Sequence, residues 1–181
     1  MLLKERLVVA ATRIVDRNEQ LSLRAIAKEC GVTAPAIYTH FENLSVIEQE
    51  VMHAGFAELA RDVQTGILSE KDPVDALLAG CRAYVNYGWE HRNRYRLMFS
   101  AGSFALNAMD TFLAAERAIE RCVDAGRSAS TDTRSDTYLL WLGLHGVATL
   151  EKPTRLEYLG LPSSDATSYL TELARRMAQI A

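Results

Sequence analysis

"AIAKECGVTAPAIYTHF" (Ala25–Phe41) contains the feature that decides the fold: one glycine between two short segments whose apolar residues recur at helical spacing. Gly31 can take a positive φ at little steric cost, so it predicts the end of a helix that follows Ser22. Thr33 is a suitable N-cap for the next helix, and Pro35 is tolerated in that helix's first turn. Two helices joined by so short a turn must cross at a sharp angle.

The pattern divides the residues of this segment between two faces. One set is apolar and should pack on a first helix over residues 3–15: Ile26, Ala27, Val32, Ile37 and Phe41. The other set remains for the outer face or the helix ends: Thr33, Ala34, Pro35, Ala36, Tyr38, Thr39 and His40. This is a helix-turn-helix whose second helix can lie in a DNA major groove. An ordinary helical hairpin is the alternative, and the geometry alone does not decide between them.

The rest of the chain also predicts helices, so the expected fold class is all-α with about nine helices. No stretch shows sustained strand alternation, and each of the four prolines stands at a plausible helix start or break. After the first three helices we expect a fourth helix capped by Asn43 and a fifth helix that begins at Asp72-Pro73. A short sixth helix should follow in "HRNRYRLMFS", with its arginines outside, and a seventh helix should be capped by Ser103. An exposed loop over 124–136 should precede the last two helices, over about 137–150 and 164–180.

Composition bounds the function. The 181 residues carry a net charge of −3, and the part up to Asn43 carries +1, because six basic residues there face five acidic ones. The direction of this asymmetry suits a nucleic-acid-binding head. No apolar run is long enough to span a bilayer, no signal peptide is evident, and three widely spaced cysteines favour reduced thiols in a cytoplasmic protein. No metal-ligand spacing or catalytic motif appears, so we predict no catalytic residue, no metal and no cofactor.

Two stretches resemble a known family. "LSLRAIAKECGVTAPAIYTHFENLSVI" (Leu21–Ile47) resembles the DNA-binding signature of tetracycline-repressor (TetR) family regulators, with "GVT" and "IYTHF" in register. "WLGLHGVATLE" (Trp141–Glu151) resembles the Trp-His-Gly motif of one C-terminal domain type in that family, as "RNRYRLMFS" resembles its short helix. The resemblance implies a helix-turn-helix domain over residues 1–46 and a ligand-binding and dimerisation domain over residues 47–181.

The resemblance also implies roles for individual residues on DNA. Tyr38 and His40 correspond to residues that contact phosphates, and Thr33 can cap its helix with its hydroxyl while nearby amides meet a phosphate. Four residues face the base edges: Ala34, Pro35, Ala36 and Thr39. Arg24 adds a base or phosphate contact. None of the four is Arg or Lys, so contacts with thymine methyl groups replace bidentate guanine reading.

Two departures from the family pattern reduce the expected phosphate contacts. Leu44 stands where the family usually has a lysine, and no basic arm precedes the first helix. Either the true start lies upstream or the affinity is lower than usual. We therefore expect a shallow salt dependence of DNA binding.

The last two predicted helices suggest a two-fold dimer. The helix over 137–150 is apolar nearly all round, so it must be covered on several sides. Monomer core is the alternative for both helices, but a four-helix interface is favoured, and it places two recognition helices about 34–36 Å apart on a pseudo-palindromic operator. The expected interface residues are Leu139, Leu142, Gly143, Gly146, Leu170, Leu173 and Met177.

A small-molecule cavity is expected among the fifth to eighth helices. Aromatic side chains with a few polar groups suit a flat or hydrophobic molecule. For each residue core packing is the alternative, and for His145 a satisfied core histidine is favoured. The expected lining is Tyr84, Trp89, Met98, Phe99, Trp141 and His145.

These features predict a homodimeric repressor that binds a double-stranded DNA operator and is released by a small hydrophobic or aromatic effector. One alternative is a small-molecule-binding helical protein that has lost DNA binding, which Leu44 and the arginine-free third helix suggest. Another is an all-helical enzyme that uses His91 or His145 as a base, which would need a carboxylate or thiol nearby in a cleft.

Overall fold

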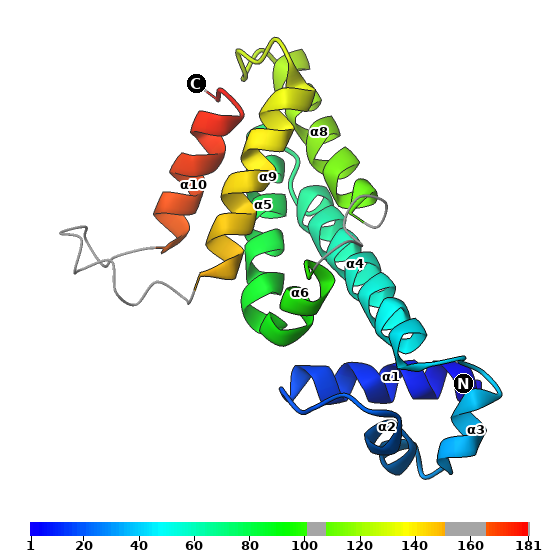
Figure 1. Cartoon of the computed structure of the whole chain (residues 1–181). Coiled ribbons are helices and arrows are strands. Elements are labelled where there is room, and N and C mark those ends of the chain that lie inside the picture. The colour runs from blue at the N-terminus through cyan, green and yellow to red at the C-terminus, as the bar shows by residue number, and fades with distance from the viewer. Residues whose placement is uncertain (101–107, 151–165, 181) are drawn as a thin grey trace, which may run out of the picture. The chain divides into compact units, whose positions relative to one another are not determined.

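The computed structural model (Figure 1) describes residues 1–100, 108–150 and 166–180. Nine helices account for most of these residues, and none of them lies in a strand, so the predicted all-α class is confirmed. An isolated antiparallel bridge pairs Ser128 with Ile180. The helices are α1 (Leu3–Asp16), α2 (Leu23–Cys30), α3 (Ala34–Tyr38), α4 (Leu44–Leu68), α5 (Pro73–Glu90), α6 (Arg92–Met98), α8 (Met109–Asp124), α9 (Thr133–Thr149) and α10 (Ala166–Met177).

The chain divides into two compact units. Unit 1 comprises Met1–Ala57 and His91–Phe104, and unit 2 comprises Glu58–Glu90 and Ala105–Ala181. Helix α4 therefore runs from one unit into the other. The short helix α6 belongs to unit 1, although it follows α5 of unit 2 after a single residue.

Side-chain caps set three of the helix starts, as predicted. The Ser22 hydroxyl accepts a hydrogen bond from the Ala25 amide (3.2 Å), and Asn43 Oδ1 accepts one from the Val46 amide (3.1 Å). Asp72 Oδ1 accepts hydrogen bonds from two amides in the first turn of α5. Local sequence therefore fixes where α2, α4 and α5 begin.

One predicted helix start is wrong. Helix α9 begins at Thr133, four residues before the predicted Thr137, so the exposed loop predicted over 124–136 is shorter. The reason is Asp132, which accepts hydrogen bonds from the Ser135 amide (3.0 Å) and hydroxyl (2.6 Å). The predicted cap Ser103 and the predicted start of the last helix near residue 164 lie outside the described residues. Helix α8 as described begins at Met109, and its N-cap residue is Ala108.

Unit 1 has a core of its own. Apolar faces of α1 and α2 meet α3 and the first turns of α4, and these residues have little or no exposed surface. Because the apolar residues of α1 recur every three or four positions, its opposite face stays polar. The core residues are Leu7, Ala10, Ala11, Ile14, Ile26, Ala27, Ile37, Phe41, Ile47 and Val51.

Unit 2 is built around α5. This helix packs against α8, α9 and α10, and most of its residues are buried, so it has little polar face. Helix α4 approaches α5 closely, because a Cβ on Gly66 would lie 2.9 Å from the Ala79 carbonyl oxygen. Among the described residues no helix is long and apolar enough to cross a membrane.

Candidate DNA-binding surface and ligand cavity

The turn between α2 and α3 has the predicted left-handed residue. Gly31 has φ +67° and ψ +33°, a conformation that side chains strongly disfavour. The Val32 amide then donates a hydrogen bond to the Ala27 carbonyl (3.0 Å), which closes the end of α2. The chain leaves this turn directly into α3.

Helix α3 buries one side chain and exposes the predicted DNA-contacting residues. Ile37 has no exposed surface, because it packs in the core of unit 1. Tyr38 is 58% exposed. Thr33, Pro35, Thr39, His40 and, on α2, Arg24 are also exposed, and Ala34 and Ala36 are half-buried.

The two threonines of α3 use their hydroxyls differently. Thr33 is the N-cap residue, but its hydroxyl makes no capping hydrogen bond, which corrects the expectation that it caps the helix with its side chain. Thr39 donates its hydroxyl proton to the Ala36 carbonyl (2.8 Å). Among the described residues the Thr33 hydroxyl has no hydrogen-bond partner, so both its donor and its acceptor are available to an outside partner.

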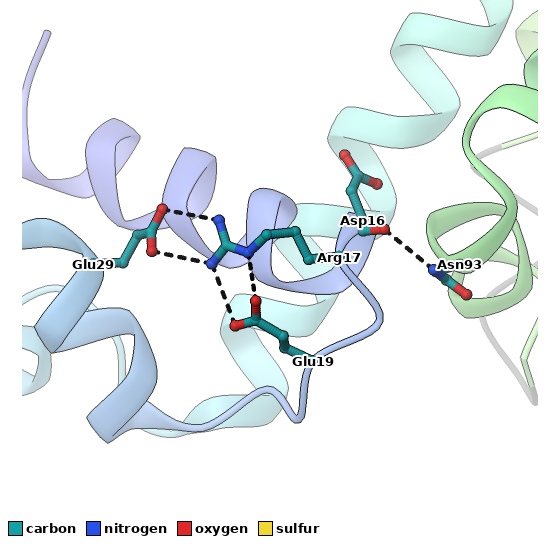
Figure 2. Close-up of polar contacts among 5 residues, drawn as sticks. All are labelled: Asp16, Arg17, Glu19, Glu29 and Asn93. Atoms are coloured by element: carbon teal, nitrogen blue, oxygen red, sulfur yellow. Dashed lines mark hydrogen bonds and ion pairs between the residues drawn. The ribbon is translucent and has the colours of Figure 1, made fainter.

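Several basic residues of unit 1 are occupied by neighbours. Figure 2 shows Arg17 between two carboxylates, at 2.6 Å from Glu19 and 3.0 Å from Glu29. The Glu19 hydrogen bond is the main cause that raises the pKa of Arg17, and the Arg17 hydrogen bond lowers the pKa of Glu29. Lys4 pairs with Glu50 at 2.8 Å.

Two basic residues of α2 have no such neighbour. Arg24 and Lys28 are exposed, stand four residues apart on one helix, and form no ion pair with any described residue. Residues at this spacing lie on the same helix face. Together they place two cations on one face of α2, which packs against α3.

Helix α6 is fastened to α1 by a buried arginine. Arg94 is only 6% exposed, and its Nε and Nη2 lie 3.1 and 2.8 Å from the two carboxylate oxygens of Asp16. Asn93 adds a hydrogen bond to the Asp16 carbonyl (3.2 Å; Figure 2). Arg94 Nη2 also lies 3.1 Å from His91 Nδ1, which must then be the acceptor. The expectation that the arginines of this helix lie outside is wrong for Arg94.

Unit 2 contains a small apolar cavity of about 30 Å³. A single water needs about 10–15 Å³, so the empty space is far smaller than a ring-shaped ligand requires. Four helices line the cavity. The lining residues are Val63 and Ile67 of α4; Leu77, Gly80, Cys81 and Tyr84 of α5; Thr111, Phe112 and Ala115 of α8; and Thr137, Leu140, Trp141 and Leu144 of α9.

The structure brings only two of the six predicted ligand residues to this cavity. Tyr84 and Trp141 line it, and the Trp141 Nε1–H donates a hydrogen bond to the Tyr84 hydroxyl (3.1 Å). His145 stacks on the Trp141 ring (5.4 Å between centroids), and its burial lowers its pKa. Trp89 donates its Nε1–H to the Val147 carbonyl (3.3 Å).

Met98 and Phe99 are not at the cavity. Both belong to unit 1, where Phe99 contacts the rings of Phe56 (5.2 Å) and Tyr95 (4.6 Å). Met98 is fully buried against Gly55. Aromatic and sulfur-containing side chains in the sequence therefore mark two separate cores rather than one pocket.

A second hollow lies in unit 1. It is wider, about 320 Å³, and open, and polar and charged side chains of both signs contribute to its wall, among them Asn18, Glu48 and Arg96. An open polar hollow suits water better than an apolar ligand.

The predicted dimer residues fall into two groups. Leu139 (49% exposed) and Leu142 (45%) present apolar surface on α9, and a Cβ on Gly146 would meet nothing within 4 Å. In contrast, the space beside Gly143 is filled by Leu173 of the same chain (2.9 Å), and Leu170 is buried. Leu173 and Met177 are half-buried.

Comparison with known families matches both parts of the chain. Residues 77–177 match the tetracycline repressor-like C-terminal domain, and residues 19–43 match the bacterial regulatory proteins of the TetR family. The chain belongs to the TetR family. This TetR-family chain thus combines a DNA-binding domain and a C-terminal domain of the kinds found in these bacterial regulatory proteins.

Individual relatives agree with the family. YobS of Bacillus subtilis (strain 168), an uncharacterised HTH-type transcriptional regulator, is 29% identical over 96 residues, which make up 52% of this chain and 50% of YobS. The TetR-family chain thus spans about half the length of the curated relative that it matches.

Two solved structures share the fold. RolR in complex with resorcinol is 16% identical with a TM-score of 0.71, over 98% of this chain and 88% of RolR. AibR in complex with isovaleryl coenzyme A and operator DNA is 15% identical with a TM-score of 0.67, over 98% of this chain and 99% of AibR. At these identities the likeness to the TetR-family chain concerns the fold alone.

Sequence reasoning missed three residues of interest in this TetR-family chain. Asp16 and Arg94 are 78 positions apart, so no local pattern joins them. Thr111 stands in the first turn of α8, where a threonine is unremarkable until its buried surroundings are known.

Proposed function

We propose that the chain is a cytoplasmic, homodimeric, ligand-responsive repressor that binds a pseudo-palindromic operator through α3 and leaves it when a small apolar effector enters the cavity of unit 2. The observation that carries the proposal is the exposed face of α3 beyond the left-handed Gly31, in a chain of the TetR family. Regulators with this geometry insert the second helix of the motif into the major groove.

On the operator, Tyr38 and His40 donate hydrogen bonds to phosphates, and the uncommitted Thr33 hydroxyl adds another. Arg24 and Lys28 supply the positive charge. Ala34, Pro35, Ala36 and the methyl group of Thr39 meet base edges, where contact with thymine methyl groups gives the sequence preference.

The dimer forms through α9 and α10. Tyr138, Leu139 and Leu142 are 45–53% exposed, and they recur at helical spacing on one face of α9, which also carries Gly146; the C-cap residue Leu150 is 64% exposed. An apolar face of this length is rare on a monomer and is typical of a subunit interface. Leu173 and Met177 extend this interface on α10, where they remain partly accessible. In this arrangement Gly143 and Leu170 act within the subunit, holding α10 against the rest of unit 2.

The effector acts by widening the cavity. Four residues of α5 line it, and α5 is followed after one residue by α6, which the Arg94–Asp16 ion pair fastens to α1. A ligand that displaces α5 therefore changes the forces on unit 1 through α6 as well as through α4. Binding favours the state with the wider cavity, and the DNA-competent state loses population.

Two relatives lend support to a ligand-responsive mechanism. RolR is known in complex with resorcinol, and AibR in complex with isovaleryl coenzyme A and operator DNA. We infer an effector nearer in size to the former, because the cavity of this chain is small and apolar.

Footprinting on the DNA upstream of the chain's own coding region tests the proposal. We expect two protected half-sites about one helical turn apart, from a protein that sediments as a dimer. Tyr38→Phe should weaken binding, because it removes only the hydroxyl that reaches a phosphate, whereas Tyr169→Phe on α10 serves as the matched control. Absence of any protected site at low salt would favour the alternative, a ligand-binding protein that has lost DNA binding.

A further inference from the structure

The polar groups that line the cavity are few, and most have partners. The Thr137 hydroxyl donates to the Thr133 carbonyl (2.6 Å), and the Tyr84 hydroxyl accepts from Trp141 (3.1 Å). Burial raises the pKa of the Cys81 thiol to about 12, so it carries no charge at neutral pH. The lining therefore contains no charged group.

Thr111 is the exception. It is 7% exposed, lines the cavity from the first turn of α8, and its Oγ1 is buried without a hydrogen-bond partner among the described residues. A buried hydroxyl without a partner is unfavourable, and such groups in native proteins need an explanation. A rotation of about 120° around the Cα–Cβ bond moves Oγ1 to another staggered position, so Oγ1 can be presented to a molecule in the cavity.

We infer that Thr111 is the hydrogen-bonding anchor of the cavity, and that the effector is an uncharged, largely apolar molecule, flat enough to lie among Tyr84, Phe112 and Trp141, with one hydroxyl or carbonyl group that bonds to Thr111. This inference rests on the proposed function in calling the ligand an effector and in the widening of the cavity that admits a ring. The cavity and the hydroxyl without a partner are features of unit 2 alone.

The charge of the ligand follows from the lining. A carboxylate or an ammonium group in this cavity would lose its hydration and meet no opposite charge, and that cost excludes ionised ligands. A ligand with a single hydroxyl would lose hydrogen bonds to water but regain one from Thr111. A purely apolar ligand of the same shape would leave the Thr111 Oγ1 without a hydrogen bond.

The test uses three probes of similar size on the full chain: phenol, toluene and benzoate. Binding is followed by tryptophan fluorescence, since Trp141 lines the cavity. We expect wild type to bind phenol about tenfold more tightly than toluene, and benzoate far more weakly than either at neutral pH. Thr111→Val should reduce the preference for phenol to within about twofold, because it keeps the shape and removes the hydroxyl. Thr111→Ser should keep the preference.

Three results would overturn the inference. They are a Thr111→Val variant that keeps the phenol preference, benzoate binding as tight as that of phenol, and no phenol binding to wild type. Thermal unfolding of the valine variant checks its fold, since it must melt no lower than wild type. Operator binding is measured in parallel without probes. If wild type binds no DNA but its phenol preference depends on Thr111, the proposed function fails and the anchor stands.

Discussion

The electrostatics of unit 1 predict how DNA binding responds to salt. Of the basic residues near the helix-turn-helix, Arg17 is held by Glu19 and Glu29 and Lys4 by Glu50, whereas Arg24 and Lys28 have no ion pair among the described residues. A paired cation has little left to offer a phosphate. Each subunit of a dimer then neutralises about two phosphates, which gives about four for the complex.

The magnitude follows from counterion release. Four neutralised phosphates give a slope of log K against log salt of about −3.6, so raising salt from about 50 to about 200 mM weakens binding about 150-fold. Eight phosphates would give a slope of about −7 and a loss of about 20,000-fold over the same range. Arg6 is not counted, because its guanidinium donates a hydrogen bond to the Cys30 carbonyl (2.9 Å). Adding the exposed Arg13, which has no ion pair with a described residue, raises the expected slope to about −5.

The perturbation is Arg24→Ala, and the matched control is Arg17→Ala. Arg24→Ala should make the slope of log K against log salt shallower by about 2, because it removes one phosphate contact from each subunit of the dimer. The second should leave the slope unchanged, since Arg17 is already paired. Fluorescence anisotropy on the footprinted fragment at several salt concentrations measures both. A wild-type slope as steep as −7, or equal effects of the two variants, would refute the reasoning.

Four further predictions concern the remaining parts of the molecule. Leu142→Glu should convert the dimer to a monomer in sedimentation and abolish footprinting, because it places a charge on the exposed apolar face of α9. Asp16→Ala leaves the buried Arg94 guanidinium without its carboxylate, so it should lower the melting temperature by several degrees and raise the effector concentration needed for half release. Burial lowers the pKa of His145 below its ordinary value of 6.5, so as the pH falls the imidazole is protonated in the unfolded chain before it is protonated in the folded chain. Stability therefore decreases as the pH falls, and in thermal melts wild type should lose more stability between pH 7.5 and 5.5 than His145→Gln does. Thr111→Val should raise the melting temperature of the ligand-free protein by about 2–4 °C, because removing a buried hydroxyl without a partner should raise the free energy of unfolding by about 1 kcal/mol. A melting temperature below that of wild type would mean that the hydroxyl has a hydrogen-bond partner.

Helix starts were predictable where the cap and its partner are close in sequence. Ser22, Asn43 and Asp72 each bond an amide two or three residues ahead, so the pattern of a polar residue before an apolar stretch contains the needed information. The start of α9 was missed because several residues of the polar run before it can serve as caps. Only the structure selects Asp132.

The cavity was only partly predictable, because its lining depends on which helices pack together. Tyr84 and Trp141 are 57 positions apart and share a hydrogen bond, whereas Phe99 is nearer to Tyr84 in sequence but belongs to unit 1. An aromatic residue in the sequence does not show which of the two units its ring belongs to, because a buried ring can pack in either core. Thr111 gave no signal at all, because its significance is the absence of a partner in three dimensions.

The division into two units gives α6 a role that its length does not suggest. Helix α4 is shared by both units and is one continuous helix of 25 residues, which can transmit a tilt only as a rigid rod. Helix α6 has only 7 residues, yet it is bonded to α1 by a bidentate ion pair and directly continues the chain from α5. Because residues of α5 between Leu77 and Tyr84 line the cavity, a displacement of α5 would reach α6 through His91, shortly before Asn93 and Arg94, which bond to Asp16. A tenfold release of DNA needs a differential of about 1.4 kcal/mol between the two states. Removing the partner of the buried Arg94 guanidinium costs more than that, so in the proposed mechanism the pair stays intact and acts as the link.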